Sequence, residues 1–294
     1  MNHSHSGVLA TILAYSIWGL LPIYWKSIET VPALEILCHR MTWSLLFLFL
    51  MLTLQKRWNL LQEVKKHPKH LFYFLGTASL LALNWYTYIW AVNSGYIIES
   101  SLGYFINPLV TIVLGMLFLR ERLRRGQWIA ISIALMGVLY LTFSYGTFPW
   151  IALILALTFG AYGLLRKTGV FNALDGLTIE TLWLFLPALC YLLYLEADGT
   201  STFGHTSWST SLLLAVTGAA TATPLLFFAY GAQRVSMATL GVLHYIAPTS
   251  QFLLGVFVYE EPFELTRLIG FSTIWLALLI YTIESLFWMK TQPG

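Results

Sequence analysis

The chain has 294 residues, of which 58% are hydrophobic and only 10% are charged, whereas an ordinary soluble domain carries roughly 25% charged residues. Together with 12 Trp, 16 Tyr and 19 Phe, this composition leaves more apolar surface than a soluble fold of this length can bury, which excludes an ordinary soluble protein. The net charge of +3 is small. The two cysteines, Cys38 and Cys190, lie inside apolar runs and indicate neither a disulfide framework nor a metal site.

Apolar runs of about 20 residues recur from end to end of the chain, and each is long enough to cross a bilayer. Runs of this length favour helices, because backbone that is exposed to lipid has to satisfy its own hydrogen bonds. The sequence therefore predicts an all-α integral membrane protein. The ten predicted transmembrane helices are residues 7–25, 33–54, 71–93, 97–119, 127–143, 148–165, 176–195, 210–232, 237–259 and 265–288.

The positively charged residues orient these helices. With a cytoplasmic N-terminus, the outer loops carry only Lys26 and Arg267. The inner loops carry Lys56, Arg57, Lys65, Lys66, Lys69, Arg120, Arg122, Arg124, Arg125, Arg166, Lys167, Arg234 and Lys290. This asymmetry follows the positive-inside rule and predicts that both termini are cytoplasmic. The basic cluster at 120–125 is interpreted as a topology signal with a secondary attraction to anionic lipids, and not as a nucleic-acid site.

An internal repeat runs through the chain at an offset of 140 residues. It lays "PALEILCHRMTW" (32–43) over "NALDGLTIETLW" (172–183), and "FINPLVTIVLGMLFLRE" (105–121) over "YIAPTSQFLLGVFVYEE" (245–261). A repeat of five helices is odd-numbered, so the second copy is inverted in the membrane. We predict two halves, residues 1–145 and 146–294. Inverted halves are typical of secondary transporters, whose substrate site lies near the membrane midplane.

Several segments resemble RarD-type members of the drug/metabolite transporter superfamily, which are EamA-domain proteins. They are "YSIWGLLPIYWK" with "VPALEILCHR", "ESSLGYFINPLVTIVLGMLFLRERLRRGQWIA", "YGLLRK" with "IETLWLFLPALCYL", and "GVLHYIAPTSQFLLGVFVYEEPF". The resemblance covers nearly the whole chain. It implies ten helices in two EamA repeats, a bacterial inner-membrane location and the export of small molecules. The family name is linked with chloramphenicol sensitivity, and so with efflux and antibiotic resistance, but the resemblance does not fix a substrate.

Two charged residues in the predicted spans are candidates for substrate binding or coupling. Arg40 lies about seven residues into its span, roughly 10 Å below the outer boundary at the rise of a helix. Ionisable groups at that depth face a cavity or a partner, so Arg40 is a candidate for binding a substrate carboxylate. The alternative is a structural clamp, for example with Glu99. Glu180, the repeat mate of Arg40, is a candidate for proton uptake, and the alternative is a helix-capping role.

Two prolines at matching mid-span positions give the strongest geometric indication of a site. Pro108 and Pro248 each remove a backbone hydrogen bond and free the carbonyl four residues back, which belongs to Tyr104 and to His244, respectively. Paired interruptions in corresponding helices indicate a transporter binding site, although a packing kink is an equal alternative. The polar residues near these prolines are Asn107, Tyr245, Thr249 and Gln251.

Three further residues are weaker candidates. His244 has a side chain that titrates near neutral pH and is a candidate for proton coupling, although a buried histidine is more often a packing residue. Asn84 and Tyr88 stand one helical turn apart, with Trp85 beside them. They are expected to line an aromatic, mildly polar cavity suited to amphiphilic molecules.

We predict a secondary active exporter of small amphiphilic molecules, either drug-like or amino-acid-like, driven by protons or another gradient and without a cofactor. A lipid-carrier flippase is the main alternative. An intramembrane enzyme is less favoured, because HExxH, GxSxG, clustered His/Cys ligands and the GxxxxGK[ST] loop are all missing from the sequence. The expected partners are a small-molecule substrate, the lipid bilayer and protons, and a homodimer is left open.

Overall fold

The computed structural model describes residues 3–58, 60, 69–94, 96–146, 148–260 and 265–291, and all regular structure among them is helical. The helices are α1 (His3–Lys26), α2 (Ala33–Leu54), α4 (Lys69–Asn93), α5 (Ile97–Leu119), α6 (Arg125–Tyr145), α7 (Trp150–Thr168), α8 (Ala173–Ala197), α9 (Trp208–Ala232), α10 (Met237–His244), α11 (Ile246–Phe257) and α12 (Leu265–Thr291). The predicted all-α class is confirmed. The predicted span 237–259 is divided at Tyr245 into α10 and α11, which make one crossing.

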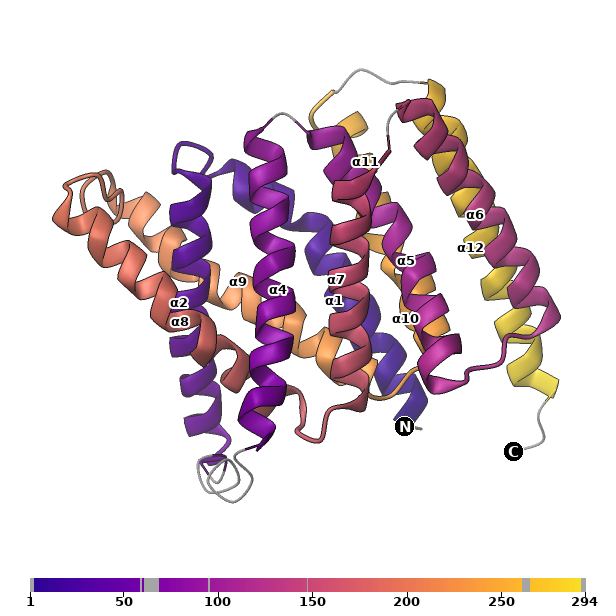
Figure 1. The fold of residues 1–294 in the computed structure, drawn as a ribbon, viewed down its shortest axis with the longest axis horizontal. Helices are drawn as coiled ribbons and strands as arrows, with labels where there is room; N and C mark the ends of the chain where they lie inside the picture. Colours follow the sequence, from indigo (N-terminus) through magenta and orange to yellow (C-terminus); the bar gives the residue numbers. More distant parts are fainter. Residues whose placement is uncertain are drawn as a thin grey trace.

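Nine helical segments within the described residues are long and apolar enough to cross a membrane. Helix α4 falls outside this set because Tyr, Trp and Asn interrupt its apolar run, yet its 25 residues exceed the roughly 20 that a bilayer requires. Figure 1 shows α4 running the full height of the bundle beside α7. The described helices thus make ten crossings, and α1 begins at the same end of the bundle at which α12 ends (Figure 1). We call this end the N-terminal face.

Local chemistry sets where the helices begin and end. Asn172 caps α8 by accepting the backbone N–H groups of Leu174 and Asp175, both at 3.1 Å. Ser207 and Ser236 cap α9 and α10 in the same way, each accepting an N–H three residues on at 3.0 Å. Such caps satisfy backbone donors that a helix leaves unpaired. The connecting segments that the structure describes are short, so successive crossings of the bundle run antiparallel.

The helices are packed through close contacts of their backbones. A Cβ atom built on Gly218 of α9 would lie 2.2 Å from the carbonyl carbon of Trp43 in α2, so only glycine permits this crossing. At the opposite edge of the bundle, α6 and α12 lie side by side (Figure 1). Arg124, which precedes α6, donates two hydrogen bonds of 2.6 Å to Glu284 of α12. Small residues at crossings and charge pairs near helix ends are typical of membrane bundles.

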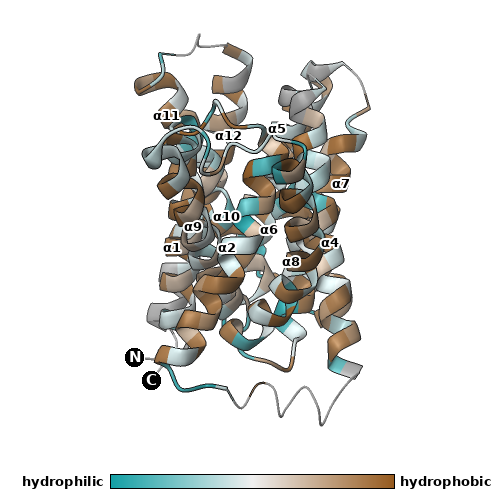
Figure 2. Ribbon diagram, turned by 90° about the vertical axis from the view of Figure 1, so that its left-hand side faces the viewer, coloured by the Kyte–Doolittle hydropathy of each residue, from teal (hydrophilic) through white to brown (hydrophobic). Residues whose placement is uncertain are grey.

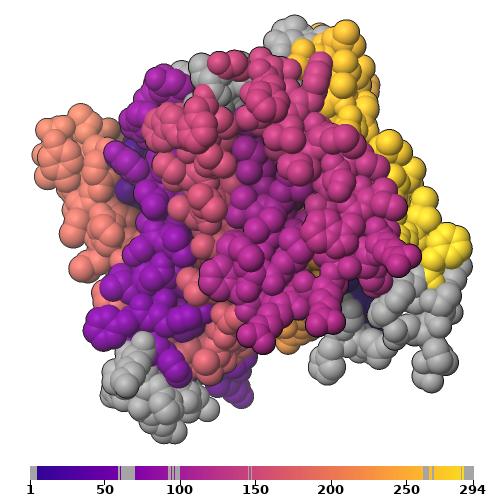
Figure 3. All heavy atoms as spheres, turned by 45° about the vertical axis from the view of Figure 1, so that its right-hand side comes forward, coloured from indigo at the N-terminus to yellow at the C-terminus, as the bar shows by residue number. Residues whose placement is uncertain are grey.

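The surface and the interior differ in polarity. Hydrophobic residues cover much of the helices in Figure 2, while hydrophilic ones gather between the helices and in the connections. Figure 3 looks onto the side formed by α4 to α7 and α12. An apolar groove of about 870 Å³ lies there between α5, α6 and α7, and its exposed walls include Leu117 and Phe143. Exposed apolar side chains within the spans match a surrounding of lipid.

Candidate functional site

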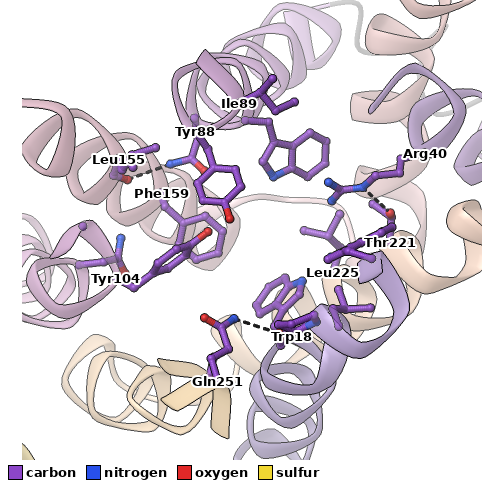
Figure 4. Close-up of a pocket in the computed structure, with 18 of the residues that line it drawn as sticks. Trp18, Arg40, Tyr88, Ile89, Tyr104, Leu155, Phe159, Thr221, Leu225 and Gln251 are labelled. Carbon is purple, nitrogen blue, oxygen red and sulfur yellow. Dashed lines mark hydrogen bonds between the residues drawn. The ribbon is translucent and has the colours of Figure 1, made fainter. Parts of the chain in front are cut away.

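A cavity of about 340 Å³ lies between helices of both halves of the sequence, within the range of volumes that small-molecule sites occupy. It is walled by α1, α2, α4, α5, α7, α9, α10 and α11, and it is lined mainly by aromatic and aliphatic side chains. The candidates Arg40, Asn84, Tyr88, Tyr104, Asn107, His244 and Gln251 all line it. Figure 4 shows several of these side chains converging on the open centre.

Arg40 supplies the positive charge of the cavity. Its Nε donates a hydrogen bond of 3.0 Å to the hydroxyl of Thr221 on α9. Its guanidinium carbon lies 4.8 Å from the ring centroid of Trp25 and 5.0 Å from that of Trp85, so the cation contacts aromatic rings from two sides. Among the described residues, no carboxylate lies within ion-pair distance of Arg40. Within the part of the chain that the structure describes, the guanidinium therefore faces the cavity without an anionic partner (Figure 4).

Three amides form the polar part of the wall, and the backbone holds each in place. Asn84 donates to the carbonyl of Leu155 at 2.9 Å. Asn107 donates to the carbonyl of Ala156, also at 2.9 Å. Gln251 donates to the carbonyl of Trp18 at 3.2 Å. These bonds fix the orientation of the amides, so that the cavity presents preformed polar groups in an otherwise apolar wall.

The aromatic candidates lie opposite Arg40. The rings of Tyr88 and Tyr104 meet edge to face with centroids 6.0 Å apart, and the hydroxyl of Tyr88 points into the cavity (Figure 4). Trp18 and Phe159 contribute further aromatic wall, with their centroids 5.8 Å apart. Sequence reasoning missed the lining residues Trp18, Trp25, Phe159 and Thr221. In a chain with 16% aromatic residues, the sequence pattern does not distinguish the rings that face a cavity from those that face lipid. Thr221 is identified only by its contact with Arg40 across two helices.

His244 lies where the cavity ends towards the N-terminal face. It is 5% exposed, its ring centroid is 4.8 Å from that of Tyr15, and its Nδ1 lacks a hydrogen-bond partner in the part of the chain that the structure describes. Beyond it, Tyr15, Tyr162 and Phe228 are fully buried in one aromatic cluster. The cavity is therefore closed on this side. Trp25 and Ala33, which lie at the adjoining ends of α1 and α2, extend its lining towards the opposite face.

Pro108 and Pro248 are buried beside the cavity and do not line it. Helix α5 continues through Pro108, whereas the partner crossing is interrupted at Tyr245, three residues before Pro248. The hydroxyl of Tyr245 donates to the carbonyl of Phe105 at 3.2 Å. These two residues are 140 positions apart, as expected at the axis that relates two repeats. The paired prolines thus lie where α5 and the α10–α11 crossing meet.

Glu180 lies outside the cavity, in a buried charge pair. It is 0% exposed, and its carboxylate accepts hydrogen bonds from Nη1 of Arg166 at 3.4 Å and from the hydroxyl of Tyr162 at 3.1 Å. The assignment of Arg166 to an inner loop is wrong, because α7 continues to Thr168 and leaves Arg166 only 1% exposed. The sequence signal that could have placed Arg166 inside the protein is Glu180, an acidic residue within the next span. Only a short connection separates the two helices, and a buried charge is strongly destabilising when it lacks a partner of opposite sign.

Other interior charges have partners within the protein. Glu35 and His39 lie 3.8 Å apart on α2, and Glu35 accepts hydrogen bonds from the backbone N–H and the hydroxyl of Thr202 at 2.7 and 2.8 Å. Glu35 therefore anchors the segment that joins α8 to α9. The side chain of Glu99, the suggested partner of Arg40, lies outside the described residues. Among the described residues, no group of three or more His, Cys, Asp or Glu is placed to hold a metal ion.

Comparison with known proteins fits this architecture. The EamA-like transporter family matches residues 5–143. Protein RarD from Streptomyces exfoliatus is 46% identical over 97% of this chain and 90% of its own length. Uncharacterized transporter YojE from Bacillus subtilis (strain 168) is 44% identical over the full length of both. Protein RarD from Escherichia coli (strain K12) is 43% identical over 97% of each chain.

A solved structure described as "Crystal structure of protein" covers 95% of this chain and 97% of its own with a TM-score of 0.71 at 18% identity, which shows the fold. The ten crossings and the relatives together define a multi-pass membrane transporter. The chain belongs to the EamA-like transporter family and, within it, to the RarD-type proteins.

Proposed function

We propose that the protein is a secondary active exporter of small amphiphilic molecules, drug-like or amino-acid-like, that carry an anionic group on an aromatic or apolar body. The observation that supports this proposal is the environment of the Arg40 side chain. Its guanidinium lies against two tryptophan rings, without a carboxylate of the described residues in ion-pair distance, in a cavity of about 340 Å³. A guanidinium in such surroundings binds a carboxylate strongly, because little water competes for it.

A proposed topology defines which side of the membrane the cavity faces in this structure. We place the N-terminal face in the cytoplasm of a bacterial cell, because the exposed Lys56, Arg57, Arg120, Arg122 and Arg125 all lie there. The same proposal divides the chain into an EamA repeat at 1–145 and an inverted repeat at 146–294. The cavity then opens away from the cytoplasm. An exporter in this arrangement releases its substrate.

A thermal-shift screen of the purified protein in detergent tests the substrate class. The panel contains amphenicols, aromatic carboxylates, free amino acids, polyamines and short lipid carriers. We expect aromatic carboxylates or amino acids to raise the melting temperature of the wild type, and Arg40→Gln to abolish that shift relative to its own baseline. Lys56→Gln is the matched control, because Lys56 is an exposed cation that follows the same helix and lies outside the cavity.

Other outcomes contradict the proposal. Stabilisation by lipid carriers alone would favour the flippase alternative. Stabilisation by polyamines alone would be incompatible with a binding site whose fixed charge is Arg40. An undiminished shift in Arg40→Gln would exclude Arg40 as the group that binds the anionic part of the substrate.

A further inference from the structure

The two halves repeat their packing contacts, and not only their sequence. At an offset of 141, one residue more than in the two segments that define the repeat, "WGLLPIYWK" (18–26) on α1 corresponds to "FGAYGLLRK" (159–167) on α7, which pairs Gly19 with Gly160. A Cβ on Gly19 would lie 2.6 Å from Cβ of Ser250, and one on Gly160 would lie 3.0 Å from a methyl of Val110. Ser250 and Val110 are themselves repeat mates, 140 residues apart. The contact between α1 and α11 therefore has its counterpart between α7 and α5.

The same correspondence relates the two guanidinium groups of the interior. Arg40 on α2 has Glu180 on α8 as its repeat mate at the offset of 140, and Trp25 on α1 has Arg166 on α7 at the offset of 141 that relates these two helices. In the first half, Arg40 lies against Trp25, with 4.8 Å between guanidinium carbon and ring centroid. In the second half, Glu180 and Arg166 are paired at 3.4 Å. In each half, the two equivalent positions on the first and second helices are thus in contact through a guanidinium group, which lies against a ring in one half and against a carboxylate in the other.

The two contacts differ in what surrounds them. Trp25 and Arg40 line the open cavity, whereas Arg166 and Glu180 are 1% and 0% exposed. Around the buried pair, Tyr162 donates its hydroxyl to Glu180, and Arg166 also donates to the carbonyl of Ala173 at 3.1 Å. The structure therefore has one of two equivalent sites open and the other sealed.

We propose that the Arg166–Glu180–Tyr162 cluster is the gate at the N-terminal face, and that Glu180 lines the cavity when that gate opens, as Arg40 does here. This inference rests on the proposed transport function. Inverted repeats can exchange conformations, so the sealed half adopts the open arrangement while the open half closes. A charge pair suits a gate, because the cost of removing both groups from water offsets most of their attraction. Opening returns both groups to water at little net cost.

Cysteine labelling in a variant without the native Cys38 and Cys190 tests the gate. Leu177→Cys places a thiol one turn from Glu180, at a position that is 1% exposed, and Ile36→Cys places one on the wall of the open cavity. With an intact gate, we expect a membrane-impermeant maleimide to react at position 36 and to leave position 177 protected. Glu180→Gln should accelerate labelling at 177 from the N-terminal face by about tenfold or more and slow it at 36, because the population shifts to the other state.

Asp175→Asn is the matched control, because Asp175 lies on the same helix and is paired at 3.0 Å with Arg57, whose side chain is 43% exposed. Tyr162→Phe removes only the hydroxyl that binds Glu180 and keeps the ring, so it tests the gate if Glu180→Gln does not fold. It should increase labelling at 177 to a smaller extent. Unchanged labelling at 177 in the folded variants, or an equal increase in Asp175→Asn, would overturn the inference. Labelling needs no substrate, so this result is independent of the thermal-shift screen.

Discussion

At the scale of single residues, the interior charges that the structure describes include several with hydrogen-bonded partners, and Arg40, which has no described carboxylate within ion-pair distance. Glu35, Glu180 and Arg166 are all buried and hydrogen-bonded within the protein. Arg40 has a hydroxyl and two aromatic rings around it, and no carboxylate among the residues that the structure describes. Burying a charge is costly unless it is paired. The groups with partners therefore have a structural explanation, and Arg40 is the residue to which a ligand would supply the partner of opposite charge.

The hydrogen bond from Thr202 to Glu35 gives a prediction about stability. Thr202→Val removes the 2.8 Å bond to a carboxylate that is 0% exposed, and we expect a loss of about 1–3 kcal/mol in the free energy of unfolding. Thermal unfolding in detergent measures it. Thr200→Val is the control, since Thr200 lies in the same segment and binds only the exposed Asp198 at 3.3 Å. Equal melting temperatures for the two variants would contradict this role of Glu35.

At the scale of helices, the crossing of α2 and α9 depends on the absence of a side chain at Gly218. Gly218→Ala would place its Cβ 2.2 Å from the Trp43 carbonyl carbon, so the two helices would have to separate, at a cost of about 1–3 kcal/mol. Gly76→Ala on α4 is the control, because no atom lies within 4 Å of the Cβ it would add. We expect the first variant to unfold at a lower temperature than the wild type and the second to remain close to it. A Gly218→Ala protein as stable as Gly76→Ala would show that this contact is not tight in the membrane.

Helix positions were predictable from the sequence, because a helix in lipid needs a long apolar run and charged residues mark where most runs end. The α2 and α5 boundaries coincide with the predicted ranges 33–54 and 97–119. Two features were not predictable on that basis. The break at Tyr245 lies inside a span that is long enough to cross as one helix, and Pro248 predicts an interruption nearby but not its position. Arg166 extends α7 beyond the predicted end, because a buried acid on α8 accepts a hydrogen bond from it.

The lining of the cavity was only partly predictable. Seven candidates were chosen as polar, aromatic or titratable groups in spans, and they share one cavity. Glu180 was chosen by the same reasoning and lies elsewhere, because a repeat predicts equivalent positions and does not predict which of two equivalent sites is open. The two prolines were chosen as helix interruptions, and they are buried beside the cavity. Trp25 and Thr221 became candidates only once the packing of α1 and α9 against α2 was known.

At the scale of the whole molecule, the cavity is open towards one face while an equivalent set of residues is sealed near the other. That asymmetry allows a gradient to drive transport, because a proton can bind from one side and leave from the other. Glu180 and His244 are the titratable candidates in this path. Glu180 is the better placed of the two, because it lies between the cavity and the N-terminal face, within the proposed gate, whereas His244 is enclosed by aromatic rings.

Proton coupling predicts that flux responds to an imposed pH gradient. In vesicles that contain the purified protein and a substrate identified by the thermal-shift screen, we expect a gradient to accelerate transport several-fold and a proton ionophore to abolish the acceleration. Glu180→Gln should lose the response to the gradient yet retain exchange driven by substrate alone, because a neutral amide can contact substrate but cannot carry a proton. Asp175→Asn, on the same helix, should keep the response. A wild-type flux that does not change with the gradient would exclude proton coupling. It would not affect the binding role of Arg40 or the gate, which are tested by the thermal-shift screen and by cysteine labelling, respectively.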